Sequence, residues 1–336
     1  MEIVNNKIDK FNLRQVILQS PDQLTAGLKL ANYTKVKGDF SNIIICGMGG
    51  SALPAHILAN LDKTKVPIFI HKDYGLSHKA DENSLVICIS YSGNTEETIS
   101  GLKDALRKGV KIVGMASGGE IEALCTKNSI PFVKIPSGIQ PRYATGYIFS
   151  SMAKVLENCE LLQKTSMEFG GLAEKLKAVN LSQEKEGISL AKKLFKKIPV
   201  VYSSSNLKDV ARIWKIKFNE NAKIPAFYNY FPELNHNEMV GYAGLKKIGT
   251  KNFFAIILQD QKDHPRIKER MELTAKLIKK NGANAQIVKV KEGSDLFKIF
   301  SALLLGDWVS YHLALLQKID PTQVQIVEDF KRLLKK

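Results

Sequence analysis

Residues 90–98, Ser-Tyr-Ser-Gly-Asn-Thr-Glu-Glu-Thr, carry four serine or threonine hydroxyls around a single glycine. The apolar run 85–89 comes before them and is short enough to be one buried strand. After them, apolar residues recur at helical spacing as far as Gly109, where a helix would end. A strand, a hydroxyl-rich loop and a helix start bring hydroxyl donors and unpaired N–H groups to one point. We therefore predict an anion site here, for which phosphate is the typical ligand.

The alternative is a simple helix cap. Ser92, Asn94 or Thr95 would then only cap the helix, while Glu96 and Glu97 stabilise its dipole. A cap needs one hydroxyl, whereas this segment offers four, so the residue types favour phosphate binding.

A second glycine-rich segment, Gly-Met-Gly-Gly-Ser-Ala at 47–52, follows the predicted strand 43–46. It also matches the relaxed dinucleotide fingerprint, which requires an acidic residue about 20 positions later to hold a ribose hydroxyl. Asp73, just after the next strand, is a poor substitute for that acid. A sugar phosphate fits both segments better, because glycines let the backbone approach the ligand and hydroxyls donate hydrogen bonds. The predicted phosphate-binding residues are Gly49, Gly50, Ser51, Ser90, Ser92 and Thr95.

Residues 140–146 form a predicted loop ahead of a helix, and the loop contains Arg142. An arginine at this position could hold a substrate oxygen or stabilise a developing enediolate. The alternative is a surface arginine whose head group is capped by its own loop.

Two further residues have types and positions that suit proton transfer. Glu220 is predicted near the C-terminus of helix 207–221, where a carboxylate is unfavourable, which suggests a catalytic base. A solvated glutamate paired with Lys223 is the alternative. His236 lies in the polar turn 232–238, which favours general acid–base catalysis over a structural role. The six histidines show no metal-ligand spacing, so we expect no metal.

Strands and helices alternate along the chain, which predicts an α/β fold with parallel sheets covered on both faces. A helical connector is expected between about residues 150 and 197, after which a second α/β half repeats the plan of the first. We predict an N-terminal domain at 1–155, a connector and second domain at 156–320 and a C-terminal helix at 321–336. The expected helices are 8–35, 53–61, 99–106, 121–127, 207–221, 265–280, 295–317 and 323–335, and the expected strands are 43–46, 68–70, 85–89, 110–115, 132–135, 200–202, 253–258 and 285–290.

Composition describes an ordinary soluble globular chain, with 44% hydrophobic and 24% charged residues among 336. The most apolar run, 300–316, is interrupted by Asp307 and His312 and is predicted to be a buried helix, not a membrane span. Residues 1–7 lack the order of a signal peptide. Cys46 and Cys88 lie in expected core strands as reduced packing residues, so we expect a cytoplasmic protein.

The net charge of +16 suits either nucleic acid or small anionic substrates. No nucleic-acid motif is present, and we expect a generally basic surface without a nucleic-acid partner. The lysines are spread along helices and not gathered in one arm: Lys192, Lys193, Lys196, Lys197, Lys246, Lys247, Lys279 and Lys280.

These motifs occur in the order and spacing of a known family. The chain resembles the bifunctional phosphoglucose/phosphomannose isomerases, which are built from two sugar-isomerase (SIS) domains, and the match covers nearly the whole chain. The loop 90–98 alone marks the wider SIS group, whereas the pair Asn-Glu-Asn and Asn-His-Asn-Glu is much more specific. The matching segments are 47–52, 90–98, 140–142, 218–223 and 235–238.

The resemblance implies aldose–ketose isomerisation of hexose 6-phosphates through a cis-enediol, without metal or cofactor. Glu220 would move the proton between C2 and C1, and Arg142 would stabilise the intermediate. The phosphate would be held by Ser51, Ser90, Ser92 and Thr95.

The resemblance also implies a homodimer in which His236 from the partner helps to open the sugar ring. A lysine of the C-terminal helix would complete the site; Lys331 is assigned by position, with Lys335 and Lys336 nearby. Tyr143 and Thr145 replace smaller residues that often follow the arginine in this family. The sequence therefore departs from the family pattern at positions that bear on the mannose 6-phosphate activity. A non-catalytic SIS sensor of sugar phosphates, or an isomerase of an aminosugar or pentose phosphate, is the competing interpretation.

Overall fold

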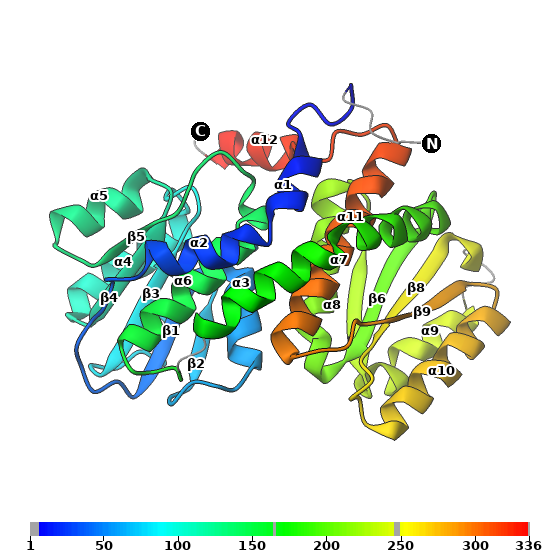
Figure 1. The fold of residues 1–336 in the computed structure, drawn as a ribbon, viewed down its shortest axis with the longest axis horizontal. Helices are drawn as coiled ribbons and strands as arrows, with labels where there is room; N and C mark the ends of the chain where they lie inside the picture. Colours follow the sequence, from blue (N-terminus) through cyan, green and yellow to red (C-terminus); the bar gives the residue numbers. More distant parts are fainter. Residues whose placement is uncertain (1–6, 164–165, 245–248, 335–336) are drawn as a thin grey trace. The chain divides into compact units, whose positions relative to one another are not determined.

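The computed structural model describes residues 7–163, 166–244 and 249–334, in which strands alternate with helices (Figure 1). The chain divides into two compact units. Gln19–Lys177 form one, here called the N-terminal unit, and Met1–Leu18 with Ala178–Lys336 form the other, the C-terminal unit. The predicted α/β class with parallel sheets is confirmed, and each unit is described separately below.

The N-terminal unit is built on a parallel sheet with the strand order β2-β1-β3-β4-β5. Every residue of β1 and β3 is buried, as expected for apolar strands covered on both faces. Cys46 and Cys88 are free and buried in these strands, which confirms them as packing residues. The strands are β1 (Asn42–Gly47), β2 (Ile68–His71), β3 (Ser84–Ile89), β4 (Lys111–Ala116) and β5 (Phe132–Lys134).

Helices cover this sheet on both faces. The chain leaves β1 outward to β2 and then returns to β3 on the other side, so right-handed crossovers place α3 and α4 on opposite faces. α4 (Glu96–Lys108) and α5 (Gly119–Lys127) share one apolar cluster with the strands. α3 (Gly49–Asn60) packs against α6 (Thr145–Asn158), which also contacts α2 (Asp22–Leu30). α4 ends at Gly109 in the left-handed conformation, as predicted.

The C-terminal unit repeats the plan with the parallel order β7-β6-β8-β9. Here α10 (Pro265–Lys280) shares an apolar cluster with the strands, while α8 (Lys208–Asn221) packs against both β6 and α11 (Asp295–Leu316). The strands are β6 (Ile198–Ser204), β7 (Phe227–Phe231), β8 (Phe253–Gln259) and β9 (Asn284–Lys289); α9 (Glu238–Gly244) and α12 (Gln325–Leu334) complete the unit.

α11 is the core helix of the C-terminal unit. Within the described residues it is the helix long and apolar enough to cross a membrane, but 94% of its apolar window is buried inside the protein. All of its residues from Leu296 to Leu315 are buried, so the prediction of a buried helix is confirmed.

The first residues of the chain belong to the C-terminal unit because polar contacts hold them there. The Asp9 carboxylate accepts hydrogen bonds from the N–H groups of Leu13 and Arg14 and from the Tyr311 hydroxyl. Arg14, in α1 (Leu13–Gln19), donates two hydrogen bonds to Glu184 at 2.8 and 2.7 Å. Glu184 lies in α7 (Ser166–Leu194), which runs from one unit into the other. The predicted domain boundary at residue 155 falls inside α6.

Several predicted elements differ from the structure in detail. The helix predicted at 8–35 is two helices, α1 and α2, interrupted at Ser20 and Pro21. Because α3 begins at Gly49, Pro54 lies inside the helix and not in its first turn as predicted. β7 and α9 were not predicted. Residues 1–6, Lys246, Lys247, Lys335 and Lys336 lie outside the described residues.

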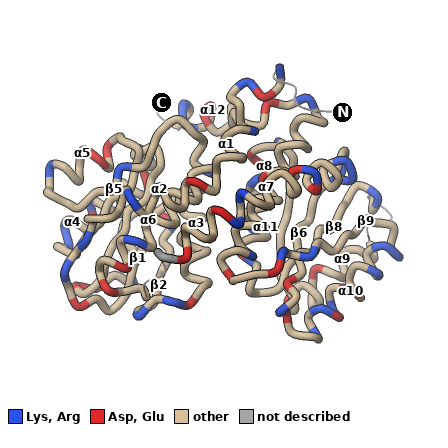
Figure 2. The backbone as a smooth tube through the Cα atoms, viewed as in Figure 1, with Lys and Arg blue, Asp and Glu red and all other residues tan. Residues whose placement is uncertain are grey.

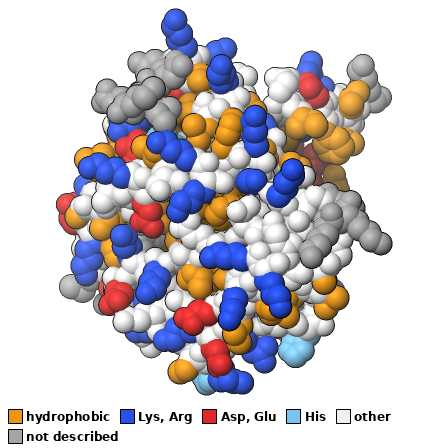
Figure 3. Space-filling view, turned by 90° about the vertical axis from the view of Figure 1, so that its right-hand side faces the viewer, with side chains coloured by type: hydrophobic (Ala, Val, Ile, Leu, Met, Phe, Trp, Pro, Cys, Tyr) orange, Lys and Arg blue, Asp and Glu red, His pale blue; other side chains and the backbone are white. Residues whose placement is uncertain are grey.

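Lysine and arginine residues occur along the helices and loops of both units, as predicted from the sequence (Figure 2). On the face drawn in Figure 3 they are interspersed with acidic and apolar side chains.

The Glu184 carboxylate makes the stability of the C-terminal unit depend on pH. Burial alone would raise its pKa, but His312 and Arg14 outweigh burial and lower the pKa from 4.5 to about 2. A carboxyl whose pKa falls on folding stabilises the protein fully above its unfolded pKa, and this contribution disappears as the pH falls through the folded pKa. A shift of this size corresponds to ~3 kcal/mol.

We therefore expect Glu184→Gln to lower the melting temperature strongly at pH 7. The difference from the unsubstituted protein should shrink as the pH falls from about 4.5 toward 2. Thermal unfolding of both proteins across this pH range measures the effect, with Glu174→Gln, an exposed α7 carboxylate, as the control. A difference that does not change with pH would contradict the assignment.

Candidate active site

The two predicted phosphate loops lie at the carboxyl ends of neighbouring strands in the N-terminal unit. β1 and β3 pair in parallel up to Gly47 and Ile89, and each strand leads into a loop and a helix. The sheet order reverses between these two strands, which is where ligands bind in open α/β sheets. The topology therefore brings the segments 47–52 and 90–95 to one edge of the sheet.

The loop after β3 is organised around Ser90, which is fully buried. The Ser90 and Thr95 hydroxyls hydrogen bond at 2.8 Å, and the N–H groups of Gly93 and Thr95 donate to Ser90 Oγ at 3.1 and 3.4 Å. Ser92 is exposed, and its hydroxyl accepts from the N–H of Asn94 at 3.3 Å. Ser90 therefore shapes the loop from within, while Thr95 lies at the start of α4.

The structure does not support the alternative that these hydroxyls only cap α4. Thr95 occupies the N-cap position but makes no side-chain cap hydrogen bond. The side chain of Asn94 instead accepts from the N–H of Glu120, at the start of α5. Met48, at the N-cap of α3, also provides no side-chain cap. The first-turn N–H groups of both helices thus carry partial positive charge without a side-chain acceptor, which suits an anion.

Ser51 joins the two loops. Its hydroxyl oxygen, in a residue only 6% exposed, accepts a hydrogen bond from the N–H of Tyr91 at 3.0 Å. The hydroxyl hydrogen of Ser51 can still be donated to a ligand. Gly49 adopts a left-handed φ of 49°, which glycine tolerates at little cost.

Arg142 lies close to the start of α3, in the 3₁₀ turn η1 (Pro141–Tyr143). A Cβ atom added to Gly50 would lie 2.7 Å from the Arg142 backbone nitrogen, so only glycine allows this close approach. Arg142 is 1% exposed, with its guanidinium carbon 5.6 Å from the centre of the Tyr143 ring and Nη1 donating to Gln140 at 3.4 Å. Arg142 is therefore not a surface arginine, although its guanidinium does donate to Gln140 of its own loop. The N-terminal unit contains both predicted phosphate loops and this buried guanidinium.

Glu220 lies in the C-terminal unit, one residue before the end of α8, as predicted. The neighbouring residues Phe218 and Asn221 are fully buried, so this helix end is firmly packed. Lys223, suggested as its partner, donates to the backbone carbonyls of Asn221 and Asp320 at 3.2 and 2.7 Å.

His236 is exposed at the end of the 3₁₀ turn η3 (Glu233–His236), in the polar turn that the sequence predicts. Its neighbours in the Asn-His-Asn-Glu motif fix the backbone around it. Asn235 donates to Thr274 at 2.8 Å, and Asn237 donates to Glu233 at 2.7 Å. The motif thus holds its other side chains in hydrogen bonds and presents the imidazole to solvent.

Glu238 anchors this turn to the sheet of the C-terminal unit. Its carboxylate accepts hydrogen bonds from the Tyr202 hydroxyl and from Asn229, both at 2.6 Å. Burial, together with Tyr242 and Glu238, raises the pKa of Tyr202, so this phenol stays protonated and donates. Sequence reasoning missed this network because Tyr202 lies 36 positions from Glu238 and because the strand β7, which carries Asn229, was not predicted.

Lys331 lies in α12, which has no buried residues, and its ammonium group pairs with Glu328 at 2.9 Å. The alternatives Lys335 and Lys336 lie outside the described residues. Among the described residues, no group of His, Cys, Asp and Glu side chains could hold a metal ion.

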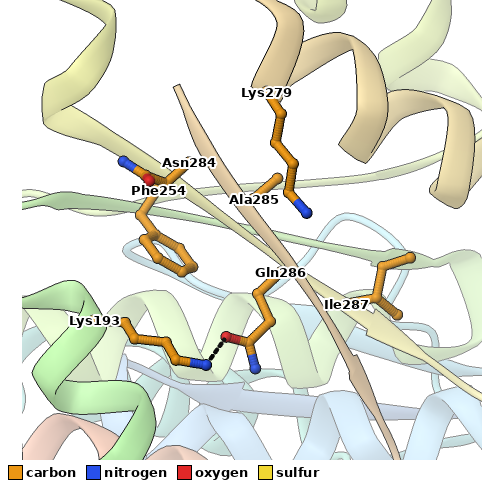
Figure 4. Close-up of a pocket in the computed structure, with 7 residues that line it drawn as sticks. All are labelled: Lys193, Phe254, Lys279, Asn284, Ala285, Gln286 and Ile287. Atoms are coloured by element: carbon orange, nitrogen blue, oxygen red, sulfur yellow. Dashed lines mark hydrogen bonds between the residues drawn. The ribbon is translucent and has the colours of Figure 1, made fainter. Parts of the chain in front are cut away.

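A pocket of about 610 Å³ lies in the C-terminal unit beside the edge strand β9 (Figure 4). None of the predicted site residues lines it. Lys193 donates to Gln286 at 2.9 Å on one side, and Lys279 points toward the strand from α10. Lysines beside an exposed edge strand typically prevent pairing with other chains, so we assign the pocket no role in the reaction. It is lined by Lys193, Phe254, Lys279, Asn284, Ala285, Gln286 and Ile287.

Comparisons with known proteins agree with this arrangement. Residues 35–127 match the SIS domain family, and residues 183–334 match the bacterial phospho-glucose isomerase C-terminal SIS domain family. The solved structure of tagatose-6-phosphate ketose/aldose isomerase from Escherichia coli is similar in fold, with a TM-score of 0.64 and 17% identity. That similarity covers 91% of this chain and 93% of the other.

Two relatives named bifunctional phosphoglucose/phosphomannose isomerase are more similar to this chain in sequence than that solved structure is. The protein of Caldicellulosiruptor bescii is 36% identical over 327 residues, covering 94% of this chain and 96% of the relative. The protein of Thermoplasma acidophilum is 37% identical over 297 residues, covering 88% and 90%. With identity of this level over nearly the full length of both chains, the protein belongs to the bifunctional phosphoglucose/phosphomannose isomerase family.

Proposed function

We propose that the protein interconverts glucose 6-phosphate, and also mannose 6-phosphate, with fructose 6-phosphate through a cis-enediol. The observation that carries the proposal is the pair of helix starts, α3 and α4, that lack side-chain caps at the reversal of the strand order. They form a site for a phosphate group, with Ser51, Ser90, Ser92 and Thr95 as its hydroxyls and Gly49 and Gly50 allowing close approach.

In the proposed reaction, Glu220 removes the proton from C2 of the open-chain aldose and returns it to C1. The Arg142 guanidinium stabilises the negative charge that develops on the enediolate oxygens. His236 moves the proton that opens the sugar ring, and Lys331 contributes a positive charge. This set of roles uses no metal and no cofactor, and the substrate is a small sugar phosphate in the cytoplasm.

The competing function is a non-catalytic sugar-phosphate sensor, which would need only the loops of the N-terminal unit. The presence of both Glu220 and His236, each in a well-defined local structure, favours an enzyme. A coupled assay that converts fructose 6-phosphate to glucose 6-phosphate separates the two functions. Pure protein that binds the sugar phosphate without turnover would be the sensor.

We also propose a homodimer in which each His236 serves the partner's site. Exposed apolar side chains lie in the elements on either side of the His236 turn: Phe227 (53% exposed) and Tyr228 (40%) in β7, and Val240 (69%) in α9. β7 is also an edge strand of its sheet. Such a surface suits contact with a second copy of the chain.

The first prediction concerns the phosphate loops. Ser51→Ala should weaken the binding of glucose 6-phosphate ~10-fold or more, since a hydrogen bond to a charged group is worth about 1.5–3 kcal/mol. The substitution also leaves the Tyr91 N–H without its acceptor. Isothermal titration calorimetry measures the affinity. Ser100→Ala, which removes a hydroxyl of α4 outside these loops, is the control, and equal affinity of both variants would argue against this site.

The second prediction concerns the catalytic base. Glu220→Gln should keep the Michaelis constant within a few-fold and lower kcat by ~10²-fold or more, the scale of general acid–base catalysis. Glu272→Gln, an exposed carboxylate on α10, is the matched control and should turn over normally. Near-normal kcat in Glu220→Gln would remove Glu220 from this role.

The third prediction tests the sharing of sites between two copies. Glu220→Gln and His236→Gln should each be nearly inactive alone. If they are mixed, dissociated and reassociated in equal amounts, about a quarter of the wild-type activity should return, because half of the dimers are hybrids with one complete site. A mixture as inactive as its components would show that both residues act within one chain.

A further inference from the structure

The buried helix α11 carries a series of polar contacts to the end of α8. The Lys217 ammonium lies 2.5 Å from the Asp307 carboxylate, and both side chains are nearly inaccessible to solvent, with exposed fractions of 4% and 11%. One turn later in both helices, the Asn221 amide donates to the Ser310 hydroxyl at 2.8 Å. At the C-terminal end of α11, Gln317 donates to the carbonyl of Ala222 at 3.0 Å.

These contacts lie on both sides of Glu220 in the sequence. Lys217 precedes it by one helical turn, Asn221 follows directly, and Ala222 comes next. All of the residues involved belong to the C-terminal unit. The backbone that carries the Glu220 side chain is therefore fixed to α11 before and after the residue.

A buried ion pair is not explained by stability alone. Removing two charges from water costs about as much as their attraction returns, and replacing such a pair by apolar residues of similar volume is often neutral or stabilising. Directional polar contacts instead fix how far one helix can slide along its neighbour and how far it can rotate against it. α11 carries other polar residues, and the Trp214 indole of α8 donates to its Ala302 carbonyl at 2.8 Å. Without the contacts described above, apolar packing would permit small shifts of the last turn of α8.

We propose that Lys217 and Asp307 are positioning residues that hold the last turn of α8 so that Glu220 keeps a fixed place. The inference rests on the proposed function, in which Glu220 must reach two neighbouring carbons of the substrate. A misplacement of about 1 Å far from the reacting atoms can cost ~10²-fold in rate. The pair acts through the helix and does not touch the substrate.

The test is the double variant Lys217→Met with Asp307→Leu. Because it replaces both charges together, it should melt close to the temperature of the parent protein. We expect kcat to fall ~10-fold or more while the Michaelis constant stays within a few-fold. A purely structural role would leave kcat of this stable variant unchanged, and kcat within twofold of the parent would overturn the proposal.

The same helix offers a matched control. Lys298 of α11 forms a second buried ion pair, with Asp260 after β8, at 2.7 Å and with exposed fractions of 5% and 13%. Lys298→Met with Asp260→Leu should keep the parent kcat, because this ion pair joins α11 to the residue after β8 and not to the last turn of α8. An equal loss of kcat in both double variants would contradict a specific role for Lys217 and Asp307.

Should the first double variant fail to fold, Ser310→Ala provides the decision. It removes the hydroxyl that accepts from the buried Asn221 amide, so it should lower kcat several-fold along with a modest fall in melting temperature. An unchanged kcat would overturn the proposal. The parent protein and Glu220→Gln are assayed alongside, so an inactive parent would count against the isomerase function and not against the positioning role alone.

Discussion

The hydrogen bond from the Tyr91 N–H to the Ser51 hydroxyl is the contact on which the proposed phosphate site depends. It ties the loop after β1 to the loop after β3, so that α3 and α4 begin next to each other at the reversal of the strand order. Each helix start leaves N–H groups without a side-chain cap, and a single uncapped start would be a weak anion site. Two starts joined by one hydroxyl combine the partial positive charges of both helices at one place.

Local sequence features were sufficient to predict most of this region. The apolar runs that became β1 and β3, the glycine-rich and hydroxyl-rich loops and the end of α4 at Gly109 each depend on a few consecutive residues. We could also predict that the loops 47–52 and 90–95 lie together, because parallel strands have their carboxyl ends at the same edge of the sheet. The sequence could not show that Ser90 is fully buried and organises its own loop, because this depends on atoms brought together by folding.

The elements that could not be predicted depend on contacts between distant residues. Arg14 and Glu184 are 170 positions apart, and Asp9 and Tyr311 are 302 apart, yet these pairs assign the first residues to the C-terminal unit. No local sequence pattern distinguishes Arg14, which pairs with a distant glutamate, from an arginine on the surface. β7 was missed for a related reason: Phe227 and Tyr228 are exposed at a sheet edge, so the strand lacks the pattern of a buried one.

Asp307 and His312, which interrupt the apolar run 300–316, indicate contacts with neighbouring helices. A charge inside a buried helix is costly unless another group pairs with it, so each interruption indicates a partner on a neighbouring element. Asp307 pairs with Lys217 of α8, and His312 lies 3.3 Å from Glu184 of α7. The same helix thereby fixes the element that carries Glu220 and the element that binds α1. A polar residue in an apolar core helix thus marks where the helix must hold its neighbours in one register, which apolar packing specifies only loosely.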